Sequence, residues 1–278
     1  MRYAINIPAF GPFADVRVLA SLASEAEEAG WDGFFLWDHI QAERGLPVAD
    51  PWIALSAIAL KTERIRIGAL VTPLPRRRPW KLAREVVTLD HLSGGRLIVG
   101  VGIGGDTFFH EFSTFNESVD DKLHAAMLDE GLDVLVGLWS GQPFSYIGQH
   151  YTVRDALFLP TPVQSPRIPI WVAGIWPNKA PLRRAARWDG VCPVVADLRV
   201  MQPEEIRDML AYIRQYRSTD APFDVALGGS MSKYAPAEAA TLLKRYAEAG
   251  VTWWEEGFLW NDTPDDVRKR IHQGPPSF

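Results

Sequence analysis

Hydrophobic residues follow two alternating spacings along the chain. Short apolar runs, typical of buried strands, occur at residues 3–8, 33–37, 65–71, 96–101, 168–173, 190–195, 223–228 and 251–255. Between most of these runs the apolar positions recur every three to four residues, which predicts amphipathic helices. The pattern therefore predicts eight strands that alternate with helices, the last helix being a short one near 264–271.

Capping residues support these boundaries. Asp15 is suited to begin the first helix, and Gly30 to end it. The tripeptide Glu-Ala-Gly at 28–30 recurs at 248–250, and a predicted strand follows each copy. Repeated helix–glycine–strand units, joined by right-handed crossovers, predict a parallel sheet.

Eight such units in 278 residues favour an α/β fold of the (β/α)8 TIM-barrel type over an open doubly wound sheet, although periodicity alone does not show closure. No linker divides the sequence, so one domain is expected over residues 1–278. The segments 102–119 and 141–166 are long for connections and rich in aromatic residues. We interpret both as lid-like insertions.

Composition narrows the class of function. Lys and Arg number 29 against 34 Asp and Glu, so nothing in the net charge of −5 favours nucleic acid or an anionic membrane as a partner. Cys192 is the one cysteine, which suits a reducing compartment. The sequence begins without a signal-peptide pattern and has no apolar run of the ~20 residues needed to span a bilayer. We expect a soluble, cytoplasmic protein that acts on a small molecule.

The carboxyl ends of the strands are where a βα barrel carries its chemistry. Trp37, Asp38 and His39 follow the second predicted strand. A histidine there can transfer a proton near neutral pH, a carboxylate can orient it, and an indole can wall in a planar ring. The alternative is that the three residues only cap and pack the next turn.

The ends of the third and fourth predicted strands each allow two interpretations. Small residues at 68–72 would admit a flat ligand, and the arginines at 76–78 could bind an anion or form a solvated basic run. The glycines at 100–105 fit the spacing G-x-G-x-x-G, but they follow the fourth strand and open no helix. That context favours room for a ligand, or a flexible loop, over a dinucleotide fingerprint.

The last strand ends offer less specific signals. Pro177 suits a helix start that could hold a phosphate, or simply an ordinary helix. Glu255 or Glu256 could face a substrate, or both could be solvated. The histidines have no metal-ligand spacing, so no metal site is predicted.

Several motifs together resemble the luciferase-like monooxygenase family, above all its deazaflavin-dependent branch. They are AGWDGFFLWDH at 29–39, LDHLSGGRLIVGVG at 89–102, PVQ at 162–164, IPIWVAG at 168–174 and AARWDG at 185–190. The resemblance extends over nearly the whole chain. It implies a (β/α)8 barrel, a flavin or deazaflavin ring at the carboxyl face, and a homodimer.

The resemblance also implies roles for single residues. Asp38 and His39 match the acid and histidine beside the reactive edge of the ring, and Ala69 and Leu70 match a pair joined by a non-prolyl cis peptide. A family glutamate is replaced by Gly105, which leaves the adjacent Asp106 as a candidate acid. The predicted catalytic residues are thus His39, Asp38 and Asp106, and the predicted cofactor-binding residues are Trp37, Ala69, Leu70, Thr72, Gly102, Gly104, Gly174 and Ile175.

The activity that the resemblance implies is hydride transfer between coenzyme F-420 and a small organic substrate. An FMN-dependent monooxygenase is the alternative cofactor assignment. A flavin-binding protein without catalysis is a third hypothesis, from another class of function. An NAD-dependent dehydrogenase is less consistent with the position of the glycine run.

Overall fold

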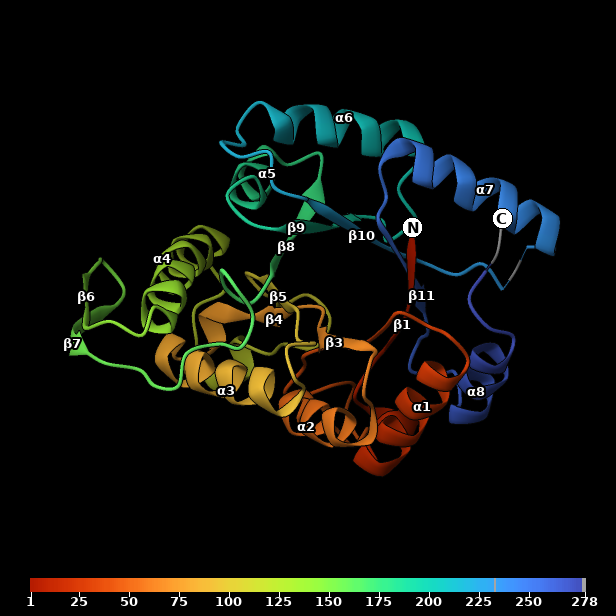
Figure 1. Cartoon of the computed structure of the whole chain (residues 1–278), viewed down its shortest axis with the longest axis horizontal. Coiled ribbons are helices and arrows are strands. Elements are labelled where there is room, and N and C mark those ends of the chain that lie inside the picture. The colour runs from red at the N-terminus through yellow and green to blue at the C-terminus, as the bar shows by residue number, and fades with distance from the viewer. Residues whose placement is uncertain (233, 277–278) are drawn as a thin grey trace.

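The computed structural model describes residues 1–232 and 234–276, with a strand barrel at the centre and helices around it (Figure 1). The strands are β1 (Arg2–Ile7), β2 (Gly33–Leu36), β3 (Arg66–Ala69), β4 (Thr72–Pro73), β5 (Val99–Gly102), β6 (Phe144–Ile147), β7 (Thr152–Ala156), β8 (Ile170–Trp176), β9 (Gly190–Val195), β10 (Asp224–Gly229) and β11 (Trp253–Gly257). The α-helices are α1 (Val16–Glu28), α2 (Pro51–Lys61), α3 (Pro79–Leu92), α4 (Asp121–Trp139), α5 (Lys179–Ala185), α6 (Pro203–Arg214), α7 (Pro236–Ala249) and α8 (Pro264–His272).

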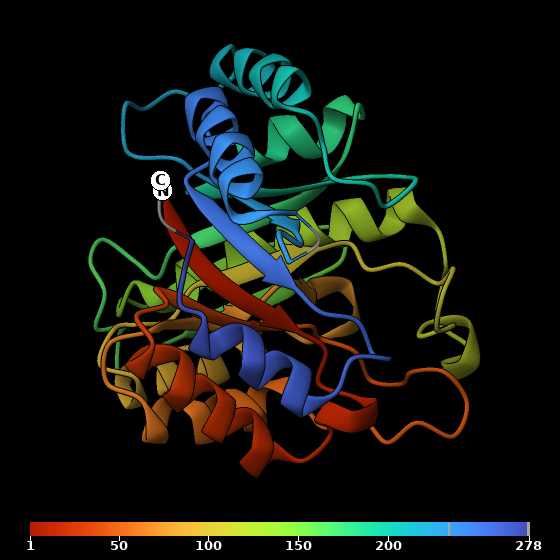
Figure 2. The same ribbon diagram turned by 90° about the vertical axis from the view of Figure 1, so that its right-hand side faces the viewer.

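The main sheet is parallel and closes on itself. Its strand order is β3-β2-β1-β11-β10-β9-β8-β5-β4, so the first and last strands of the chain pair with each other. Figure 2 shows β1 and β11 side by side at the centre, with α1 and α8 packed next to each other. The two ends of the order, β3 and β4, are consecutive pieces of one segment, and a bridge from Ile67 to Leu97 joins that segment to the start of the β5 strand. The predicted (β/α)8 barrel is confirmed.

The break between β3 and β4 falls at a cis peptide between Leu70 and Val71. The expected position, between Ala69 and Leu70, is therefore wrong by one residue. The reason lies in the neighbouring strand: Ala69 is still in register with Leu36, and the Leu70 amide still donates to the Leu36 carbonyl at 2.8 Å. Regular pairing with β2 thus continues through the amide of Leu70.

Three aromatic rings fill the part of the barrel interior that lies farther from the carboxyl ends of the strands. Phe35, Trp171 and Trp253 are fully buried, and their ring centroids lie 5.5–5.8 Å apart. Successive side chains of a strand point to opposite faces, so the inward positions next toward the carboxyl ends are Trp37, Ala173 and Glu255. These three residues line a cavity above the aromatic layer.

The bounds of α1 and the buried face of α6 agree with the sequence pattern, whereas α5 begins at Lys179 after the N-cap Asn178, so the helix start predicted at Pro177 is wrong. The Asp15 carboxylate accepts from the Arg17 amide at 2.9 Å as the N-cap of α1, and Gly30 follows that helix with a φ of 89°. The apolar stripe of α6 is buried against the barrel. Among the described residues no helix is both long and apolar enough to cross a membrane.

The two long insertions lie at opposite ends of the barrel. Gly104, Gly105 and the residues 107–109 line the cavity at the carboxyl ends of the strands. The segment 141–166 instead forms the β6–β7 hairpin beyond α4 and returns along the amino ends, where Gln164 bonds to the Leu97 carbonyl and to Asp90. The interpretation of 141–166 as a lid is therefore corrected: it does not border the cavity, because α4 carries the chain to the far end first.

Closure of the barrel predicts that Gly68 cannot be enlarged. A Cβ at this position would collide with the backbone carbonyl oxygen of Ile98, which cannot move without shifting the bridge between the two strands. We expect Gly68→Ala to lower the free energy of unfolding by about 1–3 kcal/mol, as overpacking does elsewhere. Urea unfolding measures the loss. Gly105→Ala is the matched control, because a Cβ there meets no atom within 4 Å, and an equal loss in both variants would contradict the argument.

Candidate active site

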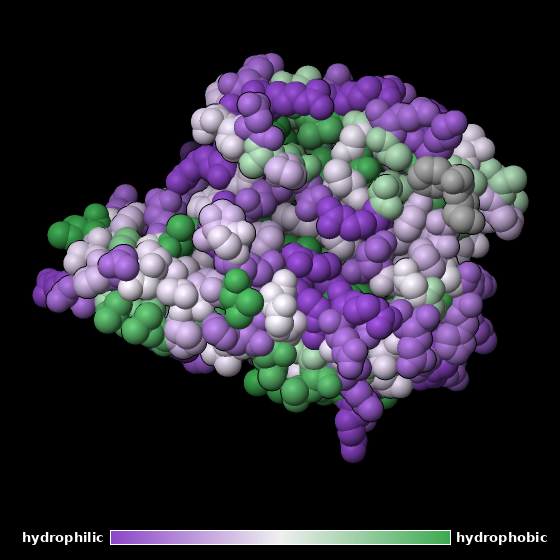
Figure 3. Space-filling model, in the orientation of Figure 1, coloured by the Kyte–Doolittle hydropathy of each residue, from purple (hydrophilic) through white to green (hydrophobic). Residues whose placement is uncertain are grey.

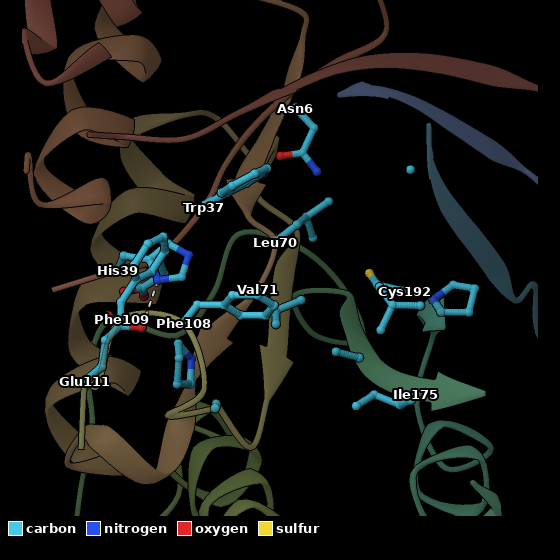
Figure 4. A pocket seen from close by; sticks show the side chains of 18 of the residues that line it. Asn6, Trp37, His39, Leu70, Val71, Phe108, Phe109, Glu111, Ile175 and Cys192 are labelled. Carbon is cyan, nitrogen blue, oxygen red and sulfur yellow. Dashed lines mark hydrogen bonds and ion pairs between the residues drawn. The ribbon is translucent and has the colours of Figure 1, made fainter. Parts of the chain in front are cut away.

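A cavity of about 520 Å³ opens at the carboxyl ends of the strands. Figure 4 shows His39, Phe109 and Glu111 on one side of it and Cys192 and Ile175 on the other, with Val71 between them. Its size lies in the range of small-molecule sites. Most of the lining is apolar or glycine, so the few polar groups determine what the cavity can do.

His39 is held on the cavity wall by a carboxylate and by aromatic rings. Its Nδ1 lies 2.8 Å from Glu111 Oε2, and the Phe109 ring meets its imidazole edge-on at 4.9 Å. The His39 side chain is 25% exposed, whereas that of Glu111 is 5% exposed. A histidine fixed through one nitrogen by a buried carboxylate is oriented for proton transfer through the other.

Glu111 is the partner that sequence reasoning did not find. Burial alone raises the pKa of Glu111, but the hydrogen bond and charge of His39 and the charge of Arg76 together lower that pKa below its ordinary value. Arg76 binds the second carboxylate oxygen at 2.7 Å, and the Ile40 amide donates to the same oxygen. The carboxylate is thus ionised and fully bonded.

Asp38 borders the cavity but does not orient His39. Its fully buried carboxylate accepts hydrogen bonds from Arg76 at 2.8 Å and Arg77 at 2.9 Å. Thr72 and Trp52 donate to the same carboxylate at 2.8 and 3.1 Å. The expected role of Asp38 is corrected for this reason: its oxygens are occupied by two arginines, a hydroxyl and an indole, and the imidazole binds Glu111 instead.

The basic run at 76–78 is divided between interior and surface. Arg76 and Arg77 are largely buried, with side chains 5% and 17% exposed, and Arg78 is exposed. Arg76 pairs with Asp38 and Glu111, and Arg77 pairs with Asp38. Because both arginines are largely buried against carboxylates, the interpretation as a solvated run is wrong for them, whereas the anion site stays a prediction.

Asp106 lies outside the cavity. Its carboxylate accepts from the hydroxyl and amide of Ser113 and from the amide of Phe112, which shapes the loop around it. The Ser113 hydroxyl is the main reason that the pKa of Asp106 falls to about 2. Because the Asp106 carboxylate turns into its own loop and does not line the cavity, its assignment as a catalytic acid is corrected.

The predicted cofactor-binding residues divide into two groups. Trp37, Leu70, Gly104 and Ile175 line the cavity. Ala69, Thr72, Gly102 and Gly174 do not border it, and this part of the prediction is corrected. The Thr72 hydroxyl donates its hydrogen bond to Asp38. Gly102 leaves room for the Val71 side chain, because a Cβ on Gly102 would lie only 2.9 Å from it. Val71, which the sequence did not single out, takes their place in the lining.

Glu255 lies on the floor of the cavity beside Asn6. The Asn6 amide donates to Glu255 Oε2 at 2.6 Å, and both residues are buried. Burial raises the pKa of Glu255 to about 7, although the Asn6 hydrogen bond works in the opposite direction. Glu256 faces the outside of the barrel, where it binds the Met231 amide at 2.9 Å. Strand alternation thus assigns only Glu255 to the cavity.

No metal centre is present among the described residues, since no three His, Cys, Asp or Glu side chains gather in a suitable cluster. Cys192 lines the cavity as a free, buried thiol whose pKa burial raises well above its ordinary value. A thiol of that kind is a poor nucleophile.

Comparison with known proteins gives a family match over most of the chain. The family model described as luciferase-like monooxygenase matches residues 4–271. The chain belongs to the luciferase-like monooxygenase family. The family resemblance drawn from the sequence motifs is confirmed.

Curated relatives include an F420-dependent glucose-6-phosphate dehydrogenase of Microbacterium testaceum, 33% identical over 180 residues, which are 63% of this chain and 51% of that protein. An uncharacterized protein of Mycobacterium tuberculosis is 32% identical over 166 residues, 59% of this chain and 56% of its own length. The chain spans about half the length of the curated relatives it matches.

Solved structures share the fold over almost the whole chain. An F420-dependent secondary alcohol dehydrogenase has a TM-score of 0.80 at 17% identity and covers 99% of this chain and 98% of its own. An FMN-bound 3,6-diketocamphane monooxygenase of Pseudomonas putida has a TM-score of 0.76 at 13% identity, with coverage of 98% and 96%. At these identities the likeness concerns the fold.

The raised pKa of Glu255 predicts a pH-dependent cost to stability. Below its ordinary value near 4.5 the carboxyl is protonated in both the folded and the unfolded chain. As the pH rises from there to about 7, the folded state retains the proton that the unfolded state loses, so stability falls. We expect Glu255→Gln to remove this loss, which amounts to about 3 kcal/mol above the folded pKa.

Urea unfolding of both proteins at about pH 4.5 and about pH 8 measures the effect, because the variant differs only in one titrating group. The variant should gain stability relative to the native chain at the higher pH. A difference between the two proteins that is the same at both pH values would show that Glu255 has an ordinary pKa.

Proposed function

We propose that this protein is an F-420-dependent oxidoreductase that transfers a hydride between the cofactor and a small organic substrate. The observation that carries the proposal is the His39–Glu111 pair on the wall of the cavity, 2.8 Å apart, at the catalytic end of the barrel. The names of the curated relatives and of the solved structures with the same fold include F420-dependent dehydrogenases, and they favour the same cofactor.

The cavity fits a flat tricyclic ring. Leu70, Val71 and Trp37 provide apolar and aromatic walls, and Gly104 adds a stretch of wall without a side chain. Two buried oxygen atoms in the lining residues, Asn6 Oδ1 and Glu255 Oε1, have no hydrogen-bond partner in the protein. Unpaired buried polar atoms in an otherwise apolar cavity are typical of a site that a ligand completes.

The protein's part in the reaction is to orient and to move a proton. Bound F-420 supplies or receives the hydride. Glu111 holds His39 by its Nδ1, so the imidazole can give or take the proton of a substrate hydroxyl or carbonyl through Nε2. The Phe109 ring, which packs against the His39 imidazole, reduces the access of water to that histidine.

An FMN-dependent monooxygenase is the second candidate. The observation in its favour is the FMN-bound monooxygenase with the same fold at a TM-score of 0.76. A flavin-binding protein without catalysis is less consistent with a histidine that a buried, ionised Glu111 orients toward open space. Binding of F-420 and FMN to the purified protein, followed by fluorescence, separates the two cofactor assignments.

Replacement of His39 by asparagine tests the proposed role. Asparagine keeps a hydrogen-bonding side chain of similar size but does not titrate near neutral pH. We expect His39→Asn to slow an F-420-linked turnover by about 10²–10⁴-fold. The affinity for F-420 should change by less than about tenfold, because the histidine acts on the proton rather than on binding.

His110→Asn is the matched control, since His110 lies in the same loop as Glu111 but is 68% exposed and does not line the cavity. Steady-state rates and fluorescence titrations of both variants give the comparison. An unchanged rate in His39→Asn would show that the proton comes from another group.

We also infer, from the family resemblance, that the protein is a homodimer and acts in the cytoplasm. Ile53 and Leu60, seven residues apart on α2, are 66% and 74% exposed and share one helix face. Figure 3 shows mostly hydrophilic side chains on the face it displays, with hydrophobic groups gathered toward the lower helices. Light scattering at micromolar concentration should give twice the mass of 31.1 kDa, and a monomer would contradict the dimer.

A further inference from the structure

The floor of the cavity differs from its His39 wall in having no cation. Asn6 on β1 and Glu255 on β11 are its polar residues, 9% and 4% exposed. The groups that face Glu255 from the neighbouring strands are Asn6, Gly228 of β10 and the Cys192 thiol of β9. Among the described residues, no Lys, Arg or His forms an ion pair with Glu255, whereas Asp38 and Glu111 have arginine partners.

The two side chains leave one donor and one acceptor unused. Asn6 Nδ2 donates to Glu255 Oε2, and neither Asn6 Oδ1 nor Glu255 Oε1 has a partner. Because burial favours the neutral carboxylic acid, Oε1 can carry the proton and donate it. Asn6 Oδ1 can only accept. The pair therefore presents a donor next to an acceptor, both already removed from water.

We propose that Asn6 and Glu255 form a hydrogen-bonding subsite for the imide edge of a flavin-type ring, in which an N–H group lies between two carbonyls. The imide N–H donates to Asn6 Oδ1, and a ring carbonyl accepts from Glu255. F-420 and FMN share this edge, so the subsite fits either cofactor. The proposal rests on the proposed function, since it assumes that a ring of this class binds in the cavity.

Charge complementarity gives the subsite a pH dependence. An ionised Glu255 would lose its donor and would turn a negative charge toward the ring carbonyl, with no cation nearby to offset it. The Cys192 thiol stays neutral in the same range, because burial raises its pKa. Affinity for the ring should therefore fall as the pH rises through neutrality.

The test compares four proteins: the native chain, Glu255→Gln, Glu255→Leu and Cys192→Ala. F-420 and FMN are titrated into each at about pH 6 and about pH 8.5, and fluorescence gives the dissociation constants. We expect the native affinity to weaken by about tenfold at the higher pH, the size of one lost hydrogen bond to a charged or buried group. Glutamine retains a donor but cannot ionise, so its affinity should be independent of pH.

Leucine removes the donor, and Glu255→Leu should bind about tenfold more weakly at the lower pH. Cys192→Ala is the matched control, since it replaces a neutral neighbour of Glu255 and leaves both members of the pair in place, and it should follow the native pH dependence. His39 also lines the cavity, but it is present in all four proteins. The contrast between native chain and glutamine variant therefore isolates Glu255.

An FMN analogue methylated at the imide nitrogen identifies the contacting edge. It should bind the native chain about tenfold more weakly than FMN, and Asn6→Leu should bind the two ligands equally, as a double-mutant cycle requires for a direct contact. If FMN does not bind, the corresponding methylated deazaflavin serves.

Equal affinities in all variants at both pH values, with the native chain binding a ring, would overturn the subsite and leave the proposed function intact. A native chain that binds neither F-420 nor FMN would overturn the proposed function and the subsite with it.

Discussion

The closed barrel directs alternate side chains of every strand into one shared interior, and the position of the site follows from this constraint. Phe35, Trp171 and Trp253 occupy one inward layer and fill it. The next inward positions toward the carboxyl ends form the walls and floor of the cavity. Gly68 permits the close approach of strands that closure requires. The depth of the cavity is thus set by how much space the aromatic layer takes.

Buried carboxylates in this interior are stabilised in two different ways. Asp38 and Glu111 each form ion pairs with arginines that follow β4 in the chain. Glu255 has an amide neighbour and no cation, and burial raises its pKa. The cost of burying an unpaired charge explains the difference. The cavity consequently has a charged side, where a proton can move, and a neutral side, where an uncharged ring edge can bind.

The sequence was sufficient for the order of strands and helices, because periodicity and capping are local properties. It also predicted that His39 follows β2 at the carboxyl end of the barrel, since the end of that strand can be located without knowing the loops. Glu111 was missed because it lies in the long segment after β5, and no spacing rule relates that loop to β2. Asp106 was chosen for its nearness in sequence to the glycines, yet its carboxylate turns into the loop. The arginine run at 76–78 is a signal for this arrangement, because arginines that follow a strand end can indicate buried carboxylates nearby, and Arg76 binds both Asp38 and Glu111.

Arg76 connects the strand end that carries Asp38 with the loop that carries Glu111. One of its guanidinium nitrogens binds Asp38 at the end of β2, and another binds Glu111 in the loop, each at 2.8 Å or less. A planar guanidinium holds two carboxylates in a fixed relation to each other. The orientation of His39 therefore depends on a loop that is itself anchored to the barrel through a rigid fork. Because Asp38 fixes this fork rather than the imidazole, it acts on the proposed proton transfer only through Arg76 and Glu111.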